Sequence, residues 1–453
     1  ALTGESLPQD KSAGDAVVSG TVNLTGVITV RTQSAYGEST AAKILELVEN
    51  AADQKAKVEG FITRFAHWYT PCVVAGAALL AVLPPLLLSQ QWSVWVERAL
   101  VFLVVSCPCA LVVSVPLTFF GGIGGASRCG ILIKGAGYME TLAKAKTVVF
   151  DKTGTLTKGS FTVTHIVPAI GTKEELLATA AAAESFSHHP IAQSVVAAYG
   201  KPVETEIEDA KDHTGRGIEA VIDGKHIFAG NERLMNEIGV TPAAVTEVGT
   251  VIHMASDQDY LGYLVIADTP KPDAAEAIRS LKADGIEKTV MLTGDKTAVA
   301  QAVAGELGLD EYRAELLPAD KVSAVEEMLK TGSPLVFVGD GINDAPVLAR
   351  ADVGVAMGAL GSDVAIEAAD IVLMDDAPVK LALAVRLSRR TMRIVWQNVI
   401  FALAVKAIVL VMGATGDANM WVAVFADVGV LVLAILNAMR ALLVPRRETA
   451  ALA

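Results

Sequence analysis

The sequence is poor in cysteine, in charged residues and in basic residues relative to acidic ones. Its 453 residues include 4 cysteines, and 19% of the residues are charged. So few cysteines cannot form a disulfide framework, so any special cysteine should be a metal ligand or a reactive thiol. The 37 basic residues are outnumbered by 50 acidic ones, which gives a net charge of −13. Proteins that grip nucleic-acid phosphates are usually basic, so we expect no nucleic-acid partner.

Hydrophobic residues, in contrast, make up 52% of the chain, which excludes a disordered polymer. Four stretches are long enough to span a bilayer, which requires about 20 apolar residues. We predict membrane spans at residues 65–88, 99–123, 395–412 and 420–436. The alternative is a set of buried core helices in a large soluble protein, but the pairing of the spans and their flanking charges favour a membrane.

The charges beside these spans predict an orientation. The connectors 89–97 and 413–419 contain no Lys or Arg, whereas the opposite ends carry basic residues: Arg64, Arg128, Lys134, Arg389, Arg390, Arg393, Arg440, Arg446 and Arg447. Because positive residues mark the cytoplasmic side, both termini and the middle segment should be cytoplasmic. Trp92, Trp95 and Trp421 fall at the outer ends, where indole rings favour the interface.

The block between the two pairs of spans, about 125–385, alternates strand-like and helix-like patterns and is predicted to be α/β. Three apolar runs in it, 147–150, 289–292 and 335–338, lead into turns that carry Asp151, Asp295, Asp340 and Asp344. In a parallel sheet these strand ends meet at one edge. Carboxylate oxygens there can bind Mg²⁺, and backbone N–H groups can bind phosphate.

Asp151 is the best candidate nucleophile of this edge, because a carboxylate can attack a γ-phosphoryl group and form an aspartyl phosphate. We expect Asp340 to hold Mg²⁺ beside it. Lys321 could supply positive charge to the transferring group. A turn aspartate alone would be a weak signal, but three such runs in one chain make chance improbable.

Three motifs resemble the signature set of P-type ATPases: 151–155 (Asp-Lys-Thr-Gly-Thr), 293–295 (Thr-Gly-Asp) and 340–346 (Asp-Gly-Ile-Asn-Asp-Ala-Pro). The segment Thr3-Gly4-Glu5-Ser6 is similar to the actuator loop of that family. The resemblance implies that Asp151 is phosphorylated and that Glu5 positions water for dephosphorylation. It also implies catalytic roles for Thr153 (through its backbone at Mg²⁺), Thr293, Asp295, Asn343 and Asp344.

Thr153 fits this family. A simple phosphatase of the same sheet type usually has an acid two residues after its nucleophile, where it serves as a general catalyst. With Thr153 at that position, a phosphoenzyme should persist until Glu5 arrives on another domain, which is what a pump requires.

The stretch between the first two strand ends resembles the nucleotide-binding domain of heavy-metal-transporting P-type ATPases. The resemblance implies that adenosine is contacted by Glu184, His189, Gly215, Gly217 and Asn231, with His188 as the alternative to His189. Taken alone, the glycine pair is a weak turn signal and a surface His-Pro is unremarkable.

The second span contains Ser106-Cys107-Pro108-Cys109. A proline opens a membrane helix locally, so the thiols of Cys107 and Cys109 can face one cavity. Thiolates favour Zn²⁺, Cd²⁺, Pb²⁺ or Cu⁺ over Ca²⁺ or Mg²⁺. The alternative is a helix kink with inert buried cysteines, and Cys72 and Cys129 are expected to be structural.

Lys406 and Asp427 lie deep in the last two spans, where a charge costs roughly 3 kcal/mol or more. They could pair when no ion is bound; with metal present, Asp427 would be a ligand and Lys406 a counter-charge. A purely structural ion pair is the alternative. Together with the cysteine pair they resemble the Zn²⁺/Cd²⁺/Pb²⁺-exporting subgroup. The Cu⁺ subgroup should show a Tyr-Asn pair, but Asn398 lacks a preceding Tyr.

The resemblance implies export of Zn²⁺, Cd²⁺ or Pb²⁺ driven by ATP and Mg²⁺, by a monomer in the lipid bilayer of a bacterial inner membrane. A Cu⁺ exporter and a membrane-anchored phosphatase are the alternatives. The family normally has four further helices and a first actuator segment before the Thr-Gly-Glu loop, so we expect the chain to be the C-terminal portion of a longer pump.

The expected fold is multidomain. It combines an α-helical transmembrane bundle with a Rossmann-like α/β phosphorylation domain of the haloacid-dehalogenase type, an α/β nucleotide-binding insert and a partial, β-rich actuator domain. The predicted boundaries are 1–45 (actuator), 46–124 (two membrane helices and linker), 125–158 with 269–385 (phosphorylation), 159–268 (nucleotide binding), 386–445 (two membrane helices) and 446–453 (tail). Within the actuator part, residues 21–30 alternate like β structure.

Overall fold

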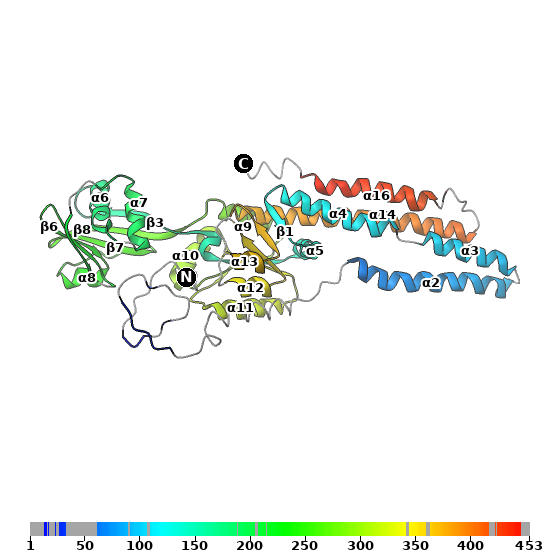
Figure 1. Ribbon diagram of the computed structural model, residues 1–453, viewed down its shortest axis with the longest axis horizontal. Coiled ribbons are helices and arrows are strands. Elements are labelled where there is room, and N and C mark those ends of the chain that lie inside the picture. The colour runs from blue at the N-terminus through cyan, green and yellow to red at the C-terminus, as the bar shows by residue number, and fades with distance from the viewer. Residues whose placement is uncertain are drawn as a thin grey trace.

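The computed structural model of the protein describes residues 13–15, 17, 23, 27–32, 61–88, 91–106, 109–187, 189–203, 207–213, 215–340, 344–358, 363–415, 422 and 424–444. The molecule is elongated (Figure 1). Long helices form one end, a seven-stranded sheet with its covering helices lies in the middle, and a six-stranded sheet forms the other end.

The central sheet is almost entirely parallel. Its strand order is β1 (Ile131–Ile133), β13 (Ile371–Leu373), β12 (Val353–Met357), β11 (Leu335–Gly339), β2 (Thr147–Asp151), β9 (Lys288–Leu292) and β10 (Glu311–Arg313), and only β1 runs antiparallel to its neighbour. Strands β11 and β12 are buried along their whole length, as expected for a parallel sheet covered on both faces.

Helices cover both faces of this sheet. One hydrophobic cluster includes side chains of α5 (Ala136–Lys144), α9 (Ala274–Ala283) and α10 (Thr297–Leu307), and a second includes side chains of α11 (Pro318–Leu329), α12 (Ala345–Arg350) and α13 (Asp363–Ala368). Strand β2 lies between β11 and β9, so the residue at its carboxyl end, Asp151, stands at the middle of the sheet edge.

The six-stranded sheet belongs to an insertion after β2, which we call the insert. Its antiparallel strands follow the order β3 (Thr157–Pro168), β8 (Asp259–Pro270), β7 (Thr250–Ser256), β6 (Lys225–Gly230), β5 (Gly217–Ile222) and β4 (Ile207–His213). Side chains of α6 (Lys173–Glu184) and α7 (Pro190–Tyr199) pack on one face, and α8 (Glu232–Glu237) contributes to a separate cluster. Because Thr157 pairs with Pro270, both connections of the insert leave the central domain side by side, six residues after Asp151.

Four helices of the described residues are long and apolar enough to cross a membrane: His67–Leu87, Ala110–Ser127, Val379–Met412 and Phe425–Leu442. They belong to α2 (Phe61–Leu88), α4 (Cys109–Ser127), α14 (Val379–Thr415) and a final helix that runs through η4 (Phe425–Gly429), α16 (Val430–Ala438) and η5 (Met439–Leu442). A shorter helix, α3 (Trp92–Val105), precedes α4.

Two of the predicted spans differ in extent from the helices of the structure. The second, 99–123, comprises the end of α3, which stops at Val105, and most of α4, which begins at Cys109. The local opening expected at Pro108 lies outside the described residues. The third, 395–412, is only part of α14, which begins at Val379; its first half is charged and therefore escapes a hydropathy criterion.

The actuator part is described at few residues. Residues 27–32 form neither helix nor strand and are exposed, so the β structure predicted for 21–30 is wrong for 27–30. Alternation alone does not make a strand, because the backbone also needs a neighbouring strand with which to pair.

Candidate phosphorylation, nucleotide and ion sites

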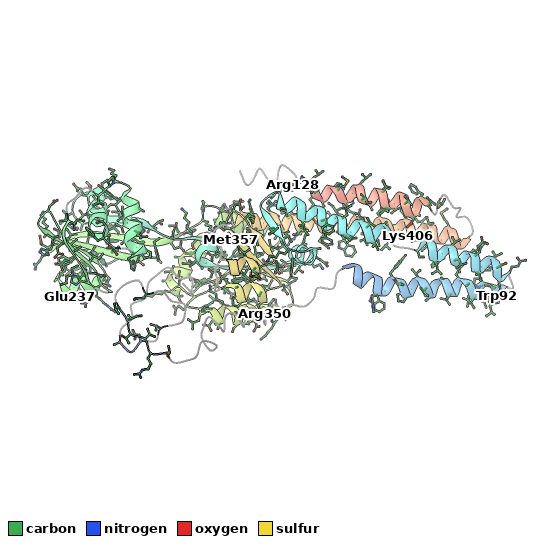
Figure 2. The ribbon with its side chains drawn as sticks, in the orientation of Figure 1. Trp92, Arg128, Glu237, Arg350, Met357 and Lys406 are labelled. Carbon is green, nitrogen blue, oxygen red and sulfur yellow. The ribbon has the colours of Figure 1, made fainter. Side chains whose placement is uncertain are left out.

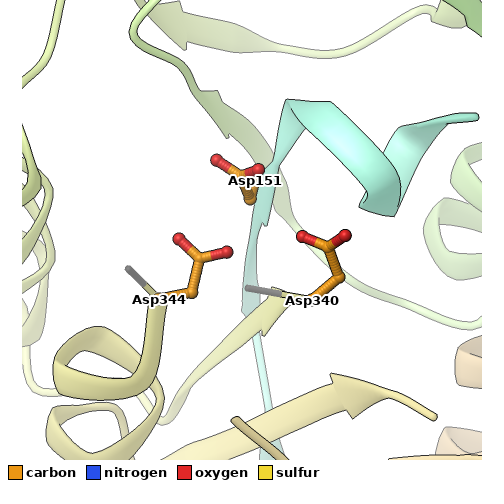
Figure 3. Close-up of side chains that lie close together, drawn as sticks. All are labelled: Asp151, Asp340 and Asp344. Atoms are coloured by element: carbon orange, nitrogen blue, oxygen red, sulfur yellow. The ribbon is translucent and has the colours of Figure 1, made fainter. Parts of the chain in front are cut away.

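Three carboxylates meet at the edge of the central sheet. Asp151 ends β2, Asp340 follows the neighbouring strand β11, and Asp344 precedes α12 (Figure 3). One oxygen from each lies within 4.8 Å of the others, and this is the only such group of potential metal ligands among the described residues. The sequence prediction that Asp151 and Asp340 converge is therefore confirmed, and Asp344 joins them.

Lys321 reaches this group from the first turns of α11. Its Nζ lies 2.5 Å from Oδ1 of Asp151 and 3.2 Å from Oδ1 of Asp344. Burial by itself lowers the pKa of Lys321, but Asp151 and Asp344 outweigh it and hold that pKa above its ordinary value. The lysine therefore carries a positive charge beside the candidate nucleophile.

One lysine does not neutralise three acids. Burial, reinforced by the charge of Asp344 and opposed by Lys321, raises the pKa of Asp151 to about 6. Burial and the charges of Asp151 and Asp344 raise the pKa of Asp340 to about 8. A cation with a preference for hard oxygen ligands would relieve this repulsion, and Mg²⁺ is such a cation. The donor set therefore fits the Mg²⁺ that the family implies.

The turn after Asp151 is shaped by Gly154. The segment from Lys152 to Leu156 is a wide helical turn in which Thr153 and Gly154 have non-helical angles, with φ of +73° at Gly154. A Cβ atom on this glycine would lie 1.7 Å from Oδ2 of Asp340. Only glycine therefore allows the chain to pass beside that carboxylate.

Thr293 and Asp295 follow the neighbouring strand β9. The Asp295 amide donates to Oγ1 of Thr293 at 3.1 Å, and the Asp295 carboxylate forms an ion pair with Lys152. Lys152 also lies 3.6 Å from Oδ2 of Asp268. Asp268 was not predicted as a site residue; it accepts from Thr157 Oγ1 at 2.5 Å, at the base of the insert.

A second lysine that the sequence analysis missed lies beneath the Gly154 turn. The Nζ of Lys271 donates to the carbonyl oxygens of Gly154 at 2.6 Å and of Asp376 at 3.1 Å. Burial lowers the pKa of Lys271, and the surrounding acids oppose this. Its sequence signal is weak: a lysine between Pro270 and Pro272.

Five residues of the insert are predicted to contact adenosine, and three of them, Gly215, Gly217 and Asn231, lie close together. The Nδ2 of Asn231 donates to the carbonyl of Gly215 at 3.0 Å. Gly217 pairs with Gly230 in the β5–β6 register, and a Cβ on Gly217 would lie 2.1 Å from the carbonyl of Ala229. The glycines thus form a closely packed turn against the N-terminus of α8.

The other two predicted residues lie on the helical side of the insert. Glu184 ends α6 and is 6% exposed; burial, together with the charge of Asp212, raises its pKa to about 7. His189 is the N-cap of α7, and its Nδ1 accepts from the amide of Ile191 at 3.2 Å. His188, the alternative to His189, lies outside the described residues.

In the helical end of the molecule (Figure 2), Lys406 is 2% exposed and its Nζ lies 3.4 Å from Oδ1 of Asp427. The predicted pairing of these residues is confirmed. Asp427 belongs to the wide helical turn η4. Ser106 directly precedes Cys107 in the sequence, and its carbonyl accepts a hydrogen bond from the hydroxyl of Tyr69 at 2.7 Å. This contact between α2 and the end of α3 was not predicted.

Several predicted site residues cannot be located in this way. Glu5, Cys107 and Asn343 lie outside the described residues, and for Cys109 only the backbone, at the start of α4, is described. Their roles stay predictions, as do those of the other site residues.

Comparisons with known proteins agree with this architecture. A family model for haloacid dehalogenase-like hydrolases matches residues 145–352, and one for the P-type ATPase actuator domain matches residues 1–49. The crystal structure of a zinc-transporting PIB-type ATPase in the E2.Pi state is similar, with a TM-score of 0.88 and 40% sequence identity over 97% of this chain and 74% of that one. The chain belongs to the P-type ATPase family.

Two relatives narrow the comparison. The chain is 56% identical over 446 residues to a cadmium, zinc and cobalt-transporting ATPase of Bacillus subtilis, covering 97% of this chain and 64% of the relative. It is 53% identical over 445 residues to a zinc-transporting ATPase of Synechocystis, covering 97% and 62%. The chain thus spans a little less than two thirds of the length of these relatives. With the four apolar helices found among its described residues, it is a membrane protein.

Proposed function

We propose that this chain carries out ATP-driven export of Zn²⁺, Cd²⁺ or Pb²⁺ through an aspartyl-phosphate intermediate. The observation that carries the proposal is the combination, in one chain, of two charge pairs. Lys321 contacts the buried Asp151, and the buried Lys406 pairs with Asp427 among apolar helices. The names of the relatives support zinc and cadmium and do not favour the Cu⁺ alternative. Pb²⁺ is included on the softness of thiolate ligands alone.

At the sheet edge, a carboxylate oxygen of Asp151 attacks the γ-phosphorus of ATP and ADP leaves. Lys321 stabilises the negative charge that develops on the transferring group. The carboxylates of Asp151 and Asp340 would hold Mg²⁺, which would supply further charge neutralisation. Glu5 then orients a water molecule that attacks the phosphorus of the acyl phosphate, which releases inorganic phosphate and restores the Asp151 carboxylate.

In the apolar helices, binding of the transported ion is also controlled by exchange of positive charges at a carboxylate. An arriving divalent ion replaces Lys406 as the partner of Asp427 and is also bound by the thiolates of Cys107 and Cys109. Because thiols must lose their protons to bind metal, binding releases protons. When the Lys406 ammonium returns to Asp427, it competes with the bound cation for the carboxylate and repels it, which favours release of the ion.

A panel of metals tests the transport half of the proposal. In the full-length gene product reconstituted in liposomes, we expect Zn²⁺ and Cd²⁺ to stimulate ATP hydrolysis. Asp427→Ala should abolish stimulation, and Lys406→Ala should bind the ion but release it poorly, so that hydrolysis under turnover falls. Stimulation by Ag⁺ or Cu⁺ alone would overturn the choice of ion. Equal hydrolysis with metal present and chelated would overturn the pump itself.

Phosphate labelling separates the pump from a membrane-anchored phosphatase. With ATP labelled at the γ-phosphate, a pump should accumulate acid-stable, metal-dependent label that is absent from Asp151→Asn. A phosphatase would turn over without metal dependence and without accumulating label.

We also propose that the pump acts as a monomer in a bacterial inner membrane. The candidate phosphorylation, nucleotide and ion sites all lie on one chain, so no second copy is needed to complete any of them. Light scattering of the detergent-solubilised protein, with the detergent mass subtracted, would give the mass of two chains if this proposal is wrong.

A further inference from the structure

A buried amide side chain joins α14 to the final helix. Asn398 of α14 is 2% exposed. Its Nδ2 donates to the carbonyl of Ala434 at 3.0 Å, and its Oδ1 accepts from Nδ2 of Asn437 at 2.9 Å. Both ends of the amide are therefore bonded to the neighbouring helix, and none of the sites described above uses this residue.

The amide shares one antiparallel register with the Lys406–Asp427 pair. Lys406 lies eight residues after Asn398 on α14, and Asp427 lies seven residues before Ala434 on the final helix. Antiparallel helices keep successive contacts at nearly equal spacing along both chains, because each helix advances 1.5 Å per residue. The amide and the ion pair are thus two points of a single alignment, separated by about 12 Å along the helices.

A third contact falls in the same register, on the other side of Asn398. The Nη1 of Arg390 donates to the carbonyl of Leu443 at 2.5 Å. Arg390 lies eight residues before Asn398, and Leu443 lies nine residues after Ala434. The alignment of the two helices therefore extends from Arg390 to Lys406.

Of these contacts, the amide resists a slip of one helix along the other most strongly. Apolar side chains lose little when helices slide in a membrane, because lipid tails are as apolar as the side chains are. The Arg390 contact is exposed, so water can replace it. Asn398 is buried among apolar helices, where no water can replace a lost partner. A single buried asparagine also fixes the register of coiled coils.

We propose that Asn398 is a positioning residue for ion release. Its amide fixes the axial register of the final helix on α14, and this register places the Lys406 ammonium at the Asp427 carboxylate. The inference rests on the function proposed above, in which the return of Lys406 to Asp427 favours release of the ion. A slip of one residue moves the two helices about 1.5 Å relative to each other, and the Lys406–Asp427 distance is already 3.4 Å. Such a slip would therefore break the contact.

Distances between spin labels test the register directly and do not depend on transport. The labels are attached through Ile408→Cys and Leu436→Cys, whose native side chains are 62% and 57% exposed, in metal-free full-length protein with all other cysteines replaced by alanine. The two positions are offset along the helix axes, so a slip changes their separation. In Asn398→Leu we expect the mean distance to shift by about 1.5 Å or more. An unchanged distance distribution would contradict the proposal.

ATP hydrolysis by reconstituted full-length protein tests whether Asn398 acts through Lys406. Asn398→Leu should lower the maximal Zn²⁺-stimulated rate roughly fivefold to tenfold, the equivalent of two interhelical hydrogen bonds of average strength in a membrane. In a Lys406→Ala background, the same substitution should lower the rate less than about twofold, whereas a merely structural role would lower both rates by the same factor. Equal factors in the two backgrounds would overturn the proposal.

Two further variants complete the test. The matched control is Gln397→Leu, which removes an exposed neighbouring amide that reaches Asn437 at 3.3 Å and should leave the label distance and the rate unchanged. Asn398→Ala separates loss of the amide from the bulk of leucine and should behave as Asn398→Leu does; wild-type behaviour of the alanine variant would refute the role of the amide. If Zn²⁺ stimulates not even the wild type, the proposed function fails, whereas the label distances still decide the register.

Discussion

At the scale of single residues, Gly154 leaves room for the Asp340 carboxylate to lie beside Asp151, because glycine has no Cβ atom. Gly154 and Gly224 both have φ of +73°, but a Cβ atom would strike Asp340 at Gly154 and would meet nothing within 4 Å at Gly224. Alanine at either position carries the same left-handed backbone cost of about 1 kcal/mol. The two glycines therefore separate backbone strain from displacement of the carboxylate.

We expect Gly154→Ala to lower the rate of phosphoenzyme formation about a hundredfold, because it moves Asp340 by more than 1 Å from the reacting groups. Gly224→Ala should leave that rate nearly unchanged. Quenched-flow labelling with radioactive ATP measures both. Similar rates in the two variants would mean that the position of Asp340 does not limit the chemistry.

Glu184 predicts a pH dependence of stability. Its pKa in the folded insert is raised from 4.5 to about 7, chiefly by burial. A carboxyl with a raised folded pKa contributes stability that is complete below the unfolded pKa and is lost as the pH rises through the folded one. Glu184→Gln is neutral at every pH, so it should be more stable than the wild type by about 3 kcal/mol near pH 8 and similar to it near pH 4.

Hydrogen exchange of the α6 amides, corrected for intrinsic rates, measures this locally in the whole protein. Glu174→Gln is the control, because Glu174 is an exposed residue in the first turn of the same helix. If the protection of α6 in Glu184→Gln changes with pH as it does in the wild type, Glu184 is not the titrating group.

The residues of the sheet edge could be predicted where a motif and a strand end coincide, as at Asp151 and Asp340. Contacts between distant segments could not. Lys152 meets Asp295 across 143 residues, and Lys271 meets Gly154 across 117; nothing in the local sequence indicates which lysine reaches which partner.

At the scale of secondary-structure elements, α14 shows what hydropathy can and cannot predict. The predicted span 395–412 covers the apolar half of this helix, whereas most of the charged half lies before it. Arg386 and Arg389 of that half bind Asp284 and the carbonyl of Ala143 in the central domain. Polar contacts to the central domain, rather than contacts with lipid, thus stabilise the beginning of the helix. A sliding hydropathy window detects apolar residues and therefore does not detect this part of the helix.

Lys271 connects the turn that contains Gly154 to the start of α14. Its two carbonyl partners belong to Gly154 and to Asp376, the latter three residues before α14. Asp273, two residues further on, accepts from the Val379 amide at 3.1 Å. If the Gly154 turn moves during phosphorylation, these hydrogen bonds would therefore displace the N-terminus of α14.

Lys271→Met keeps the length of the side chain and removes its three donors, leaving two carbonyls without a strong partner at a cost of about 1–3 kcal/mol. We expect the phosphoenzyme to form more slowly and its level to depend less on Zn²⁺. Lys282→Met is the matched control: Lys282 is an exposed lysine on α9 that bonds to Gly308 and Asp310. An unchanged dependence on Zn²⁺ in Lys271→Met would exclude it as a link.

At the scale of the whole molecule, one continuous helix joins the two candidate centres. The 37 residues of α14 extend roughly 55 Å at 1.5 Å per residue. Its N-terminus is held by the central domain through Asp273, and Lys406 near its far end is paired with Asp427. A rigid rod of this kind can convert a displacement at the phosphorylated edge into a shift of the Lys406 ammonium relative to the carboxylate.

Ile400 offers a place to break the rod without touching either centre. Its side chain is 64% exposed on the surface of α14, six residues before Lys406. Ile400→Pro removes a helical hydrogen bond and kinks the helix at a cost of about 3 kcal/mol, whereas Ile400→Ala shortens the same side chain and preserves the helix. In reconstituted full-length protein, we expect Ile400→Pro to bind Zn²⁺ but to hydrolyse ATP at a rate that no longer responds to it, with Ile400→Ala behaving as the wild type. If Ile400→Pro keeps its full response to Zn²⁺, the signal between the centres travels by another route, through α4 or the final helix, and the continuity of α14 has no part in it.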